Sequence, residues 1–198
     1  MGARSVTGII LSGGENSRMG RNKAFLTVDG ERLIDRTIRI YKELFAEVIL
    51  VTNEPLDYLD LDVTVVTDIY PGRKALGGIY TGLFYAKDSH AFVAACDMPC
   101  LNAEFIAYLM ERALPYDIVV PHAADGPQPL HAVYARTCLP AIKNSLLRDK
   151  LKVTGFYKGL KVLRIPEGTI QSFDPRARMF LNVNTPQDLI RLKSDSSL

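Results

Sequence analysis

The sequence has little of what marks membrane, secreted and nucleic-acid-binding proteins. Lysine and arginine total 24 against 22 acidic residues, and no long run of like charge occurs. A surface so nearly balanced argues against a nucleic-acid partner. Neither a signal peptide nor an apolar stretch of membrane-spanning length is recognisable, so we expect a cytoplasmic protein with no membrane association.

Cysteine is also scarce, because the chain contains three cysteines in all. Cys96 and Cys100 flank Asp97, but no second pair is present to complete a tetrahedral zinc site. Buried free thiols in a reducing cytoplasm are therefore the preferred interpretation.

The apolar residues that are present suit one domain, which we expect to span residues 1–198. Of these 198 residues, 47% are hydrophobic, enough for a well-buried core. Continuous apolar runs alternate with segments of helical periodicity, which predicts an α/β fold: a three-layer, doubly wound, Rossmann-like arrangement with a mainly parallel sheet and helices on both faces. The expected strands are 6–11, 47–52, 63–66, 91–95, 118–121, 130–134 and 161–165, and the expected helices are 31–45, 77–86, 102–112 (capped by Asn102), 139–147 and 187–192.

A glycine loop with a basic flank follows the first expected strand. Its pattern matches neither the Walker loop nor GxGxxG. Ligands of open α/β sheets bind beyond the carboxyl ends of strands, where glycines let the backbone approach a phosphate and cations neutralise its charge. Each residue alone suits an ordinary glycine turn with a solvated flank, but together they predict phosphate binding. The residues are Leu11, Ser12, Gly13, Gly14, Arg18 and Lys23.

The stretch LSGGENSRMGRNKAFL resembles LxxGxSxRMGxxK, the signature of nucleotidyltransferases that activate small phosphorylated compounds. Further blocks, including ACDMP at 95–99 and NVNTP at 182–186, resemble the molybdenum cofactor guanylyltransferase family in the same order over most of the chain. The resemblance implies magnesium-dependent (Mg²⁺) transfer of GMP from GTP to the phosphate of molybdopterin (Mo-molybdopterin), with release of pyrophosphate. It also implies a transient molybdoenzyme or cofactor-synthesis protein as a partner.

Gly13 favours GTP over other nucleotides within this resemblance. The guanylyl branch commonly carries LAGG where cytidylyl and many sugar-phosphate enzymes carry LAAG, and the missing methyl gives a purine edge more room. Ser12 replaces the usual alanine. Cytidylyl transfer to molybdopterin and nucleotidyl transfer to a sugar or polyol phosphate remain alternatives, as does a non-enzymatic nucleotide-binding adaptor, against which Lys23 and Asp97 argue.

Three polar residues follow expected strands at the same sheet edge. A buried carboxylate such as Asp97 is costly without a partner, so a cation is its natural companion, although it also suits a turn cap. The resemblance assigns magnesium to Asp97 and nucleotide contacts to Asn53 and Asp68. From the sequence alone, Asn53 and Asp68 are as well explained as turn residues.

The acceptor side of the cleft is expected near Gly77, Gly78, Asn182 and Asn184. The glycine pair is expected to open a helix whose free N–H groups face an anion, while Arg73 and Lys74 would serve the acceptor's phosphate. Alternation in a strand would put both asparagine amides on one face, although Asn184 also suits a helix cap. The chemistry requires no general base because the attacking phosphate is already ionised, so we favour a structural or substrate-contact role for His131.

Overall fold

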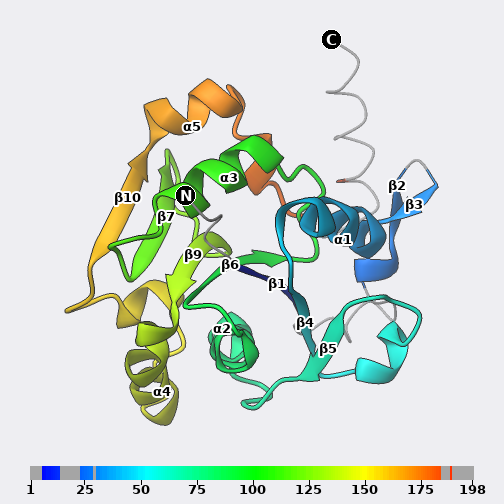
Figure 1. Cartoon of the computed structure of the whole chain (residues 1–198), viewed down its shortest axis with the longest axis horizontal. Coiled ribbons are helices and arrows are strands. Elements are labelled where there is room, and N and C mark those ends of the chain that lie inside the picture. Colours follow the sequence, from blue (N-terminus) through cyan, green and yellow to red (C-terminus); the bar gives the residue numbers. More distant parts are fainter. Residues whose placement is uncertain (1–5, 14–22, 29, 184–187, 189–198) are drawn as a thin grey trace.

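The computed structural model describes residues 6–13, 23–28, 30–183 and 188. Its main sheet has eight strands in the order β10-β7-β9-β6-β1-β4-β5, with β8 paired to β7 (Figure 1). A separate two-stranded sheet joins β2 and β3. The strands are β1 (Thr7–Ser12), β2 (Thr27–Val28), β3 (Glu31–Arg32), β4 (Val48–Thr52), β5 (Thr64–Thr67), β6 (His90–Ala95), β7 (Ile118–Ala123), β8 (Gly126–Pro127), β9 (His131–Ala135) and β10 (Val162–Pro166).

The sheet is mainly parallel, as the continuous apolar runs predict. β5, β4, β1 and β6 are mutually parallel neighbours, and β10 is parallel to β7. β9 runs antiparallel to both β6 and β7. The segment between β7 and β9 is too short for a parallel crossover, which explains the reversal. The carboxyl ends of β5, β4, β1 and β6 therefore share one edge.

Helices cover both faces of the sheet, which confirms the expected three-layer α/β architecture. The buried apolar residues of α3, α5 and, apart from Leu33, α1 belong to one core cluster, whereas those of α2 and α4 belong to another. Figure 1 shows α1, α3 and α5 above the sheet and α2 and α4 below it. The helices are α1 (Leu33–Leu44), α2 (Lys74–Tyr85), α3 (Ala103–Glu111), α4 (Leu139–Leu147) and α5 (Glu167–Phe173).

Helix α1 confirms an amphipathic prediction but begins later than expected. Ile34, Ile38 and Tyr41 recur at helical spacing and are buried against the sheet. The Tyr41 hydroxyl donates to the Ile9 carbonyl at 3.2 Å, which ties the helix to β1. The helix starts at Leu33 because the two preceding residues form β3 and pair with β2.

Helix α2 begins at Lys74 rather than at Gly77, so that part of the prediction is wrong. Gly72 takes a positive φ of 76° and Lys74 one of 53°. The turn that they form starts the helix at Lys74. Further along, a Cβ at Gly82 would lie 2.6 Å from Ile9 Cγ2. The small residues of α2 thus let the helix pack closely on β1.

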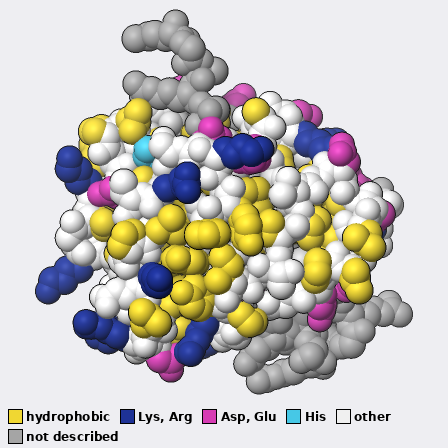
Figure 2. Space-filling view, turned by 60° about the horizontal axis from the view of Figure 1, so that its bottom comes forward, with side chains coloured by type: hydrophobic (Ala, Val, Ile, Leu, Met, Phe, Trp, Pro, Cys, Tyr) yellow, Lys and Arg dark blue, Asp and Glu magenta, His cyan; other side chains and the backbone are white. Residues whose placement is uncertain are grey.

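The outward side of α2 is apolar as well as its inward side. Figure 2, turned to bring the face of α2 and α4 forward, shows hydrophobic side chains gathered near its centre. Phe84 and Tyr85 at the end of α2 are about half exposed, and Leu147 at the end of α4 is 72% exposed. Within the described ranges, none of the helices is both long and apolar enough to span a membrane.

Candidate active site

The polar residues of the candidate site lie at the edge of the sheet where successive connections between strands pass to opposite faces. The link from β1 to β4 passes through α1 on one face, and the link from β5 to β6 passes through α2 on the other. This makes the carboxyl end of β1 a topological switch point, where open α/β sheets bind ligands. Asn53, Asp68 and Asp97 follow β4, β5 and β6, which confirms that they lie at one edge of the sheet.

A cavity of 390 Å³ lies at this edge, within the size range of small-molecule sites. It brings together six residues that the sequence singled out as site candidates: Leu11, Gly13, Asn53, Asp68, Lys74 and Gly78. Its other lining residues are Val51, Thr52, Gly72 and Ala75.

Among the residues that the structure describes, none packs closely against Gly13. A Cβ at this position would lie 3.8 Å from Asn53 Nδ2, an ordinary contact distance, and its φ is outside the left-handed region. At Gly78, by contrast, a Cβ would come within 3.0 Å of Leu11 Cδ2. A methyl group at Gly13, which lines the cavity, would therefore meet no close contact from the described residues.

The carboxylate of Asp68 is held in a fixed orientation. Its Oδ1 accepts hydrogen bonds from the Thr81 hydroxyl at 2.7 Å and from the Tyr70 N–H at 3.0 Å. Its Oδ2 lies next to Gly77, where a Cβ would approach it to 3.0 Å. Gly77 thus provides room for this carboxylate beside the cavity.

The expected anion site at the Gly77–Gly78 pair is not formed by a helix amino end. The Gly77 N–H donates to the Arg73 carbonyl at 3.3 Å inside α2, so it is not available to an anion. Gly78 lines the cavity together with Asn53 and Asp68. Helix α2 begins three residues earlier than predicted, and Lys74 and Ala75 of its first turn line the cavity instead.

The two cations before the glycine pair have separate environments. Arg73 forms an ion pair with Asp149, whereas Lys74 lines the same cavity as Asn53 and Asp68. The sequence singled out both cations but assigned them to the acceptor. Neither Lys74 nor Gly72, two residues before it, was expected on the nucleotide side, although their position after β5 was a signal for it.

Asp97 offers a buried oxygen suited to a cation. Among the residues that the structure describes, its Oδ1 has no hydrogen-bond partner. Burial raises the pKa of the carboxyl above its usual value, and the Lys23 ammonium opposes that rise. A hard divalent cation would satisfy such an oxygen, so the residues present fit a metal ion here. Lys23 itself begins the short 3-10 helix Lys23–Phe25.

Ser12 turns its side chain away from the cavity. Its hydroxyl is buried and lies 2.5 Å from the Tyr58 hydroxyl, and it also hydrogen-bonds the Cys96 thiol. Burial raises the pKa of that thiol to about 12, so Cys96 is protonated at neutral pH. A nucleotide contact by Ser12 would therefore come from its backbone.

The segment expected at the acceptor side is tied to Asp97 through the backbone. The Val183 N–H donates to the Asp97 carbonyl at 2.8 Å, and the Val183 side chain is buried beside Leu33. The preceding Asn182 is exposed, and residues 181–183 form no strand, contrary to the expected alternation. Gly14, Arg18 and Asn184 lie outside the described residues, as does the helix expected at 187–192 apart from Asp188.

His131 is an aromatic core residue and does not line the cavity. Its ring lies 5.1 Å from those of Phe92 and Phe180 and 5.8 Å from that of Phe105. Both ring nitrogens are buried without a hydrogen-bond partner within the described part of the chain. Burial lowers the pKa of the imidazole to about 3, so the ring is neutral. A structural role accounts for all of these features.

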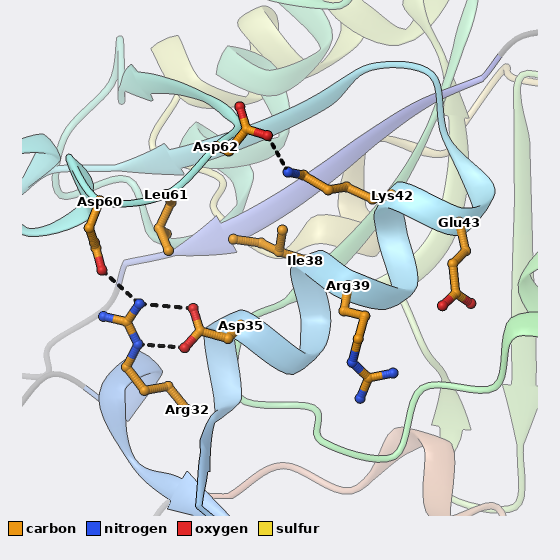
Figure 3. Close-up of a pocket in the computed structure, with 9 residues that line it drawn as sticks. All are labelled: Arg32, Asp35, Ile38, Arg39, Lys42, Glu43, Asp60, Leu61 and Asp62. Carbon is orange, nitrogen blue, oxygen red and sulfur yellow. Dashed lines mark hydrogen bonds and ion pairs between the residues drawn. The ribbon is translucent and has the colours of Figure 1, made fainter.

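A second hollow on the outer side of α1 is a poorer candidate because most of its charges are already paired (Figure 3). Arg32 lies 2.6 Å from the Asp35 carboxylate and 2.7 Å from that of Asp60. Lys42 lies 2.6 Å from the Asp62 carboxylate. The hollow is lined by Arg32, Asp35, Ile38, Arg39, Lys42, Glu43, Asp60, Leu61 and Asp62.

Known proteins share both this sequence and this fold. Residues 8–161 match the family described as MobA-like NTP transferase domain. Molybdenum cofactor guanylyltransferase of Desulfosudis oleivorans is 38% identical over 187 residues, which cover 93% of each chain. The crystal structure of molybdopterin-guanine dinucleotide biosynthesis protein A from Archaeoglobus fulgidus is similar with a TM-score of 0.83 and 25% identity, over 97% of this chain and 99% of that one.

A more distant structure shares the fold alone. Rv0371C from Mycobacterium tuberculosis H37Rv, solved as a complex with manganese, matches with a TM-score of 0.64 and 16% identity, over 98% of this chain and all of that one. The 38% identity and the match over residues 8–161 are the stronger findings. The chain is therefore an enzyme of the MobA-like NTP transferase family and a relative of the molybdenum cofactor guanylyltransferases.

Proposed function

We propose that this enzyme transfers GMP from GTP to the terminal phosphate of molybdopterin, forming molybdopterin guanine dinucleotide and pyrophosphate. The observation that carries the proposal is the convergence of Gly13, Asn53 and Asp68 on one cavity, at the same sheet edge as Asp97. The relatives named molybdenum cofactor guanylyltransferase support the choice of both substrates.

The proposed step is an in-line displacement at phosphorus. An ionised phosphate oxygen of molybdopterin attacks the α-phosphorus of GTP and forms a new P–O bond. The bond from the α-phosphorus to the bridging oxygen breaks, and its electron pair leaves with pyrophosphate. Because the attacking oxygen is already ionised, catalysis consists of positioning and charge neutralisation, with no protein base.

The cavity residues supply the positioning. Gly13 leaves room for the nucleotide, while the Asn53 amide and the Asp68 carboxylate offer hydrogen-bonding groups to it. Lys23, which interacts electrostatically with Asp97, and Arg18 would neutralise the charge of the triphosphate. Lys74 lines the cavity and adds a third cation on the nucleotide side.

We assign the metal to Asp97 and propose that it is Mg²⁺. Mg²⁺ prefers oxygen ligands and is commonly held by one or two carboxylates together with substrate phosphates and waters. Oδ1 of Asp97, which has no hydrogen-bond partner among the described residues, supports this assignment, and the manganese complex of the structure with the same fold is consistent with a divalent cation. When bound there, Mg²⁺ would neutralise charge on the phosphate oxygens.

The acceptor is proposed to approach from the side of Asn182 and Asn184. The hydrogen bond from the Val183 N–H to the Asp97 carbonyl supports this placement because it holds the segment next to the metal ligand. We place the reaction in the cytoplasm, which is consistent with three unpaired cysteines. A molybdoenzyme or cofactor-synthesis protein is the proposed transient partner.

An Asp97 variant tests the proposal. Asp97→Asn keeps the size of the side chain but removes its charge, so pyrophosphate release from GTP with Mg²⁺ and molybdopterin should become undetectable. Asp62→Asn is the matched control, since that carboxylate is exposed on the far side of α1 and should be dispensable. Near-normal release by the Asp97 variant would refute the metal assignment.

A further inference from the structure

Thr81 is buried beneath the cavity and holds the Asp68 carboxylate. It lies on α2, is fully buried and does not line the cavity. Its hydroxyl accepts a hydrogen bond from the Ile69 N–H at 2.9 Å and donates one to Asp68 Oδ1 at 2.7 Å. One hydroxyl therefore joins helix α2, the backbone after β5 and a carboxylate of the cavity.

This arrangement makes the two oxygens of Asp68 unequal. Both hydrogen bonds that the described residues donate to this carboxylate, from Thr81 and Tyr70, go to Oδ1. Oδ2 lies against Gly77, at a position that a Cβ there would crowd. The carboxylate therefore keeps Oδ2 as an acceptor with unused lone pairs.

A hydrogen-bond acceptor held in a fixed position is complementary to the edge of guanine that carries the C2 amino group. Guanine carries an amino group at C2 that donates hydrogen bonds, and hypoxanthine lacks that group. A site built around a hydrogen bond rejects an analogue that cannot make it. Such rejection requires that the acceptor be held in place, because a freely rotating carboxylate would adapt to other bases.

We infer that Thr81 is a positioning residue for base selection, acting through the hydrogen bond that orients Asp68 toward the amino edge of guanine. The inference rests on the proposed function because it assumes that GTP occupies the cavity. It adds a residue that never touches the nucleotide but sets the discrimination between GTP and ITP, the nucleotide of hypoxanthine.

Three substitutions distinguish the effect of the Thr81 hydroxyl from the effect of the size of its side chain. Thr81→Val replaces the hydroxyl with a methyl group of similar size, whereas Thr81→Ser retains the hydroxyl and loses the methyl group. Thr81→Ala differs from Thr81→Ser by the hydroxyl alone, so this pair carries the test if the valine variant does not fold. The Kd values of GTP and ITP are measured by calorimetry with Mg²⁺, below the melting temperature of each variant.

The wild type should bind GTP more tightly than ITP, and Thr81→Val and Thr81→Ala should lower that preference about tenfold. Thr81→Ser should keep it. If Thr81 had only a structural role, its substitution would weaken the binding of GTP and ITP equally. An unchanged ratio of the Kd values for GTP and ITP in Thr81→Val and Thr81→Ala would therefore overturn the inference. A wild type that does not discriminate between the two would also overturn it. Tighter binding of CTP than GTP by the wild type would instead overturn the proposed function.

Discussion

Gly13 and Gly82 lie on either side of the contact between β1 and α2 but meet different surroundings. Around Gly13 the nearest atom of the described residues to an added Cβ would be 3.8 Å away, whereas at Gly82 it would be 2.6 Å away. Close packing therefore accounts for Gly82, whereas contacts within the described part of the chain do not account for Gly13. The space in front of Gly13 belongs to the cavity.

Gly13→Ala should accordingly change binding rather than stability. We expect the free energy of unfolding to remain within about 1 kcal/mol of the wild type, because the new methyl group meets no atom of the described residues closely. The affinity for GTP should fall about tenfold, because the methyl group would occupy space that the nucleotide requires. Urea denaturation and GTP titration measure the two quantities.

Gly82→Ala is the matched control, and it should lose about 1–3 kcal/mol of stability through overpacking against Ile9. Wild-type GTP affinity in Gly13→Ala would show that the missing methyl group has no part in nucleotide binding.

His131 should make the stability sensitive to acid. The folded state holds its pKa at about 3, whereas the unfolded chain has the usual value near 6.5. Between these values the unfolded state binds a proton that the folded state does not, so the free energy of unfolding falls as the pH falls through this window. At pH 5 the loss is about 2 kcal/mol.

His131→Phe should remove that loss, because phenylalanine suits a site surrounded by Phe92, Phe105 and Phe180 and does not titrate. Urea midpoints at pH 7.5 and pH 5 compare the variant with the wild type. An equal drop in both proteins would mean that His131 is not the source of the acid sensitivity.

Among the elements, the amphipathic and buried segments were the predictable ones. The spacing of apolar residues predicted a helix over 139–147, and α4 spans Leu139–Leu147. Asn102 was expected to cap α3, and its Oδ1 accepts from the Phe105 N–H at 2.9 Å. Local patterns suffice where one face of a helix packs on the sheet and a cap satisfies its first N–H groups.

Short elements and the start of α2 depended on tertiary structure. Helix α5 was not predicted; Gly168 and Thr169 lie within it, and the buried Ile170 packs it onto the core. The left-handed conformation of Lys74 starts α2 early, although lysine has no local preference for it. Local propensity could not indicate either feature.

The candidate site likewise contains residues that could be predicted from the sequence and residues that could not. Asn53, Asp68 and Asp97 were predictable because each follows an apolar or β-branched strand, and parallel strands end at one edge. The roles of Lys74 and Thr81 were not, because they depend on how α2 packs against β1 and the loop after β5. Strand ends are visible in a sequence, whereas the placement of a helix across them is not.

At the scale of the whole molecule, the sheet separates two cores and leaves the site at their common edge. Leu11 belongs to the core under α2, whereas Ile10 and Cys96 belong to the core under α1. The cavity lies on the α2 side, and Ser12 contacts Tyr58 on the other. Residues from both layers therefore contribute to the same sheet edge.

The central claim is that this edge selects GTP and transfers its GMP group to molybdopterin. The most direct test measures pyrophosphate release from GTP, CTP, ATP and UTP in parallel, with Mg²⁺ and molybdopterin present. We predict that GTP exceeds each of the others at least about tenfold in kcat/KM. Equal rates with all four nucleotides, or a preference for CTP, would contradict the claim.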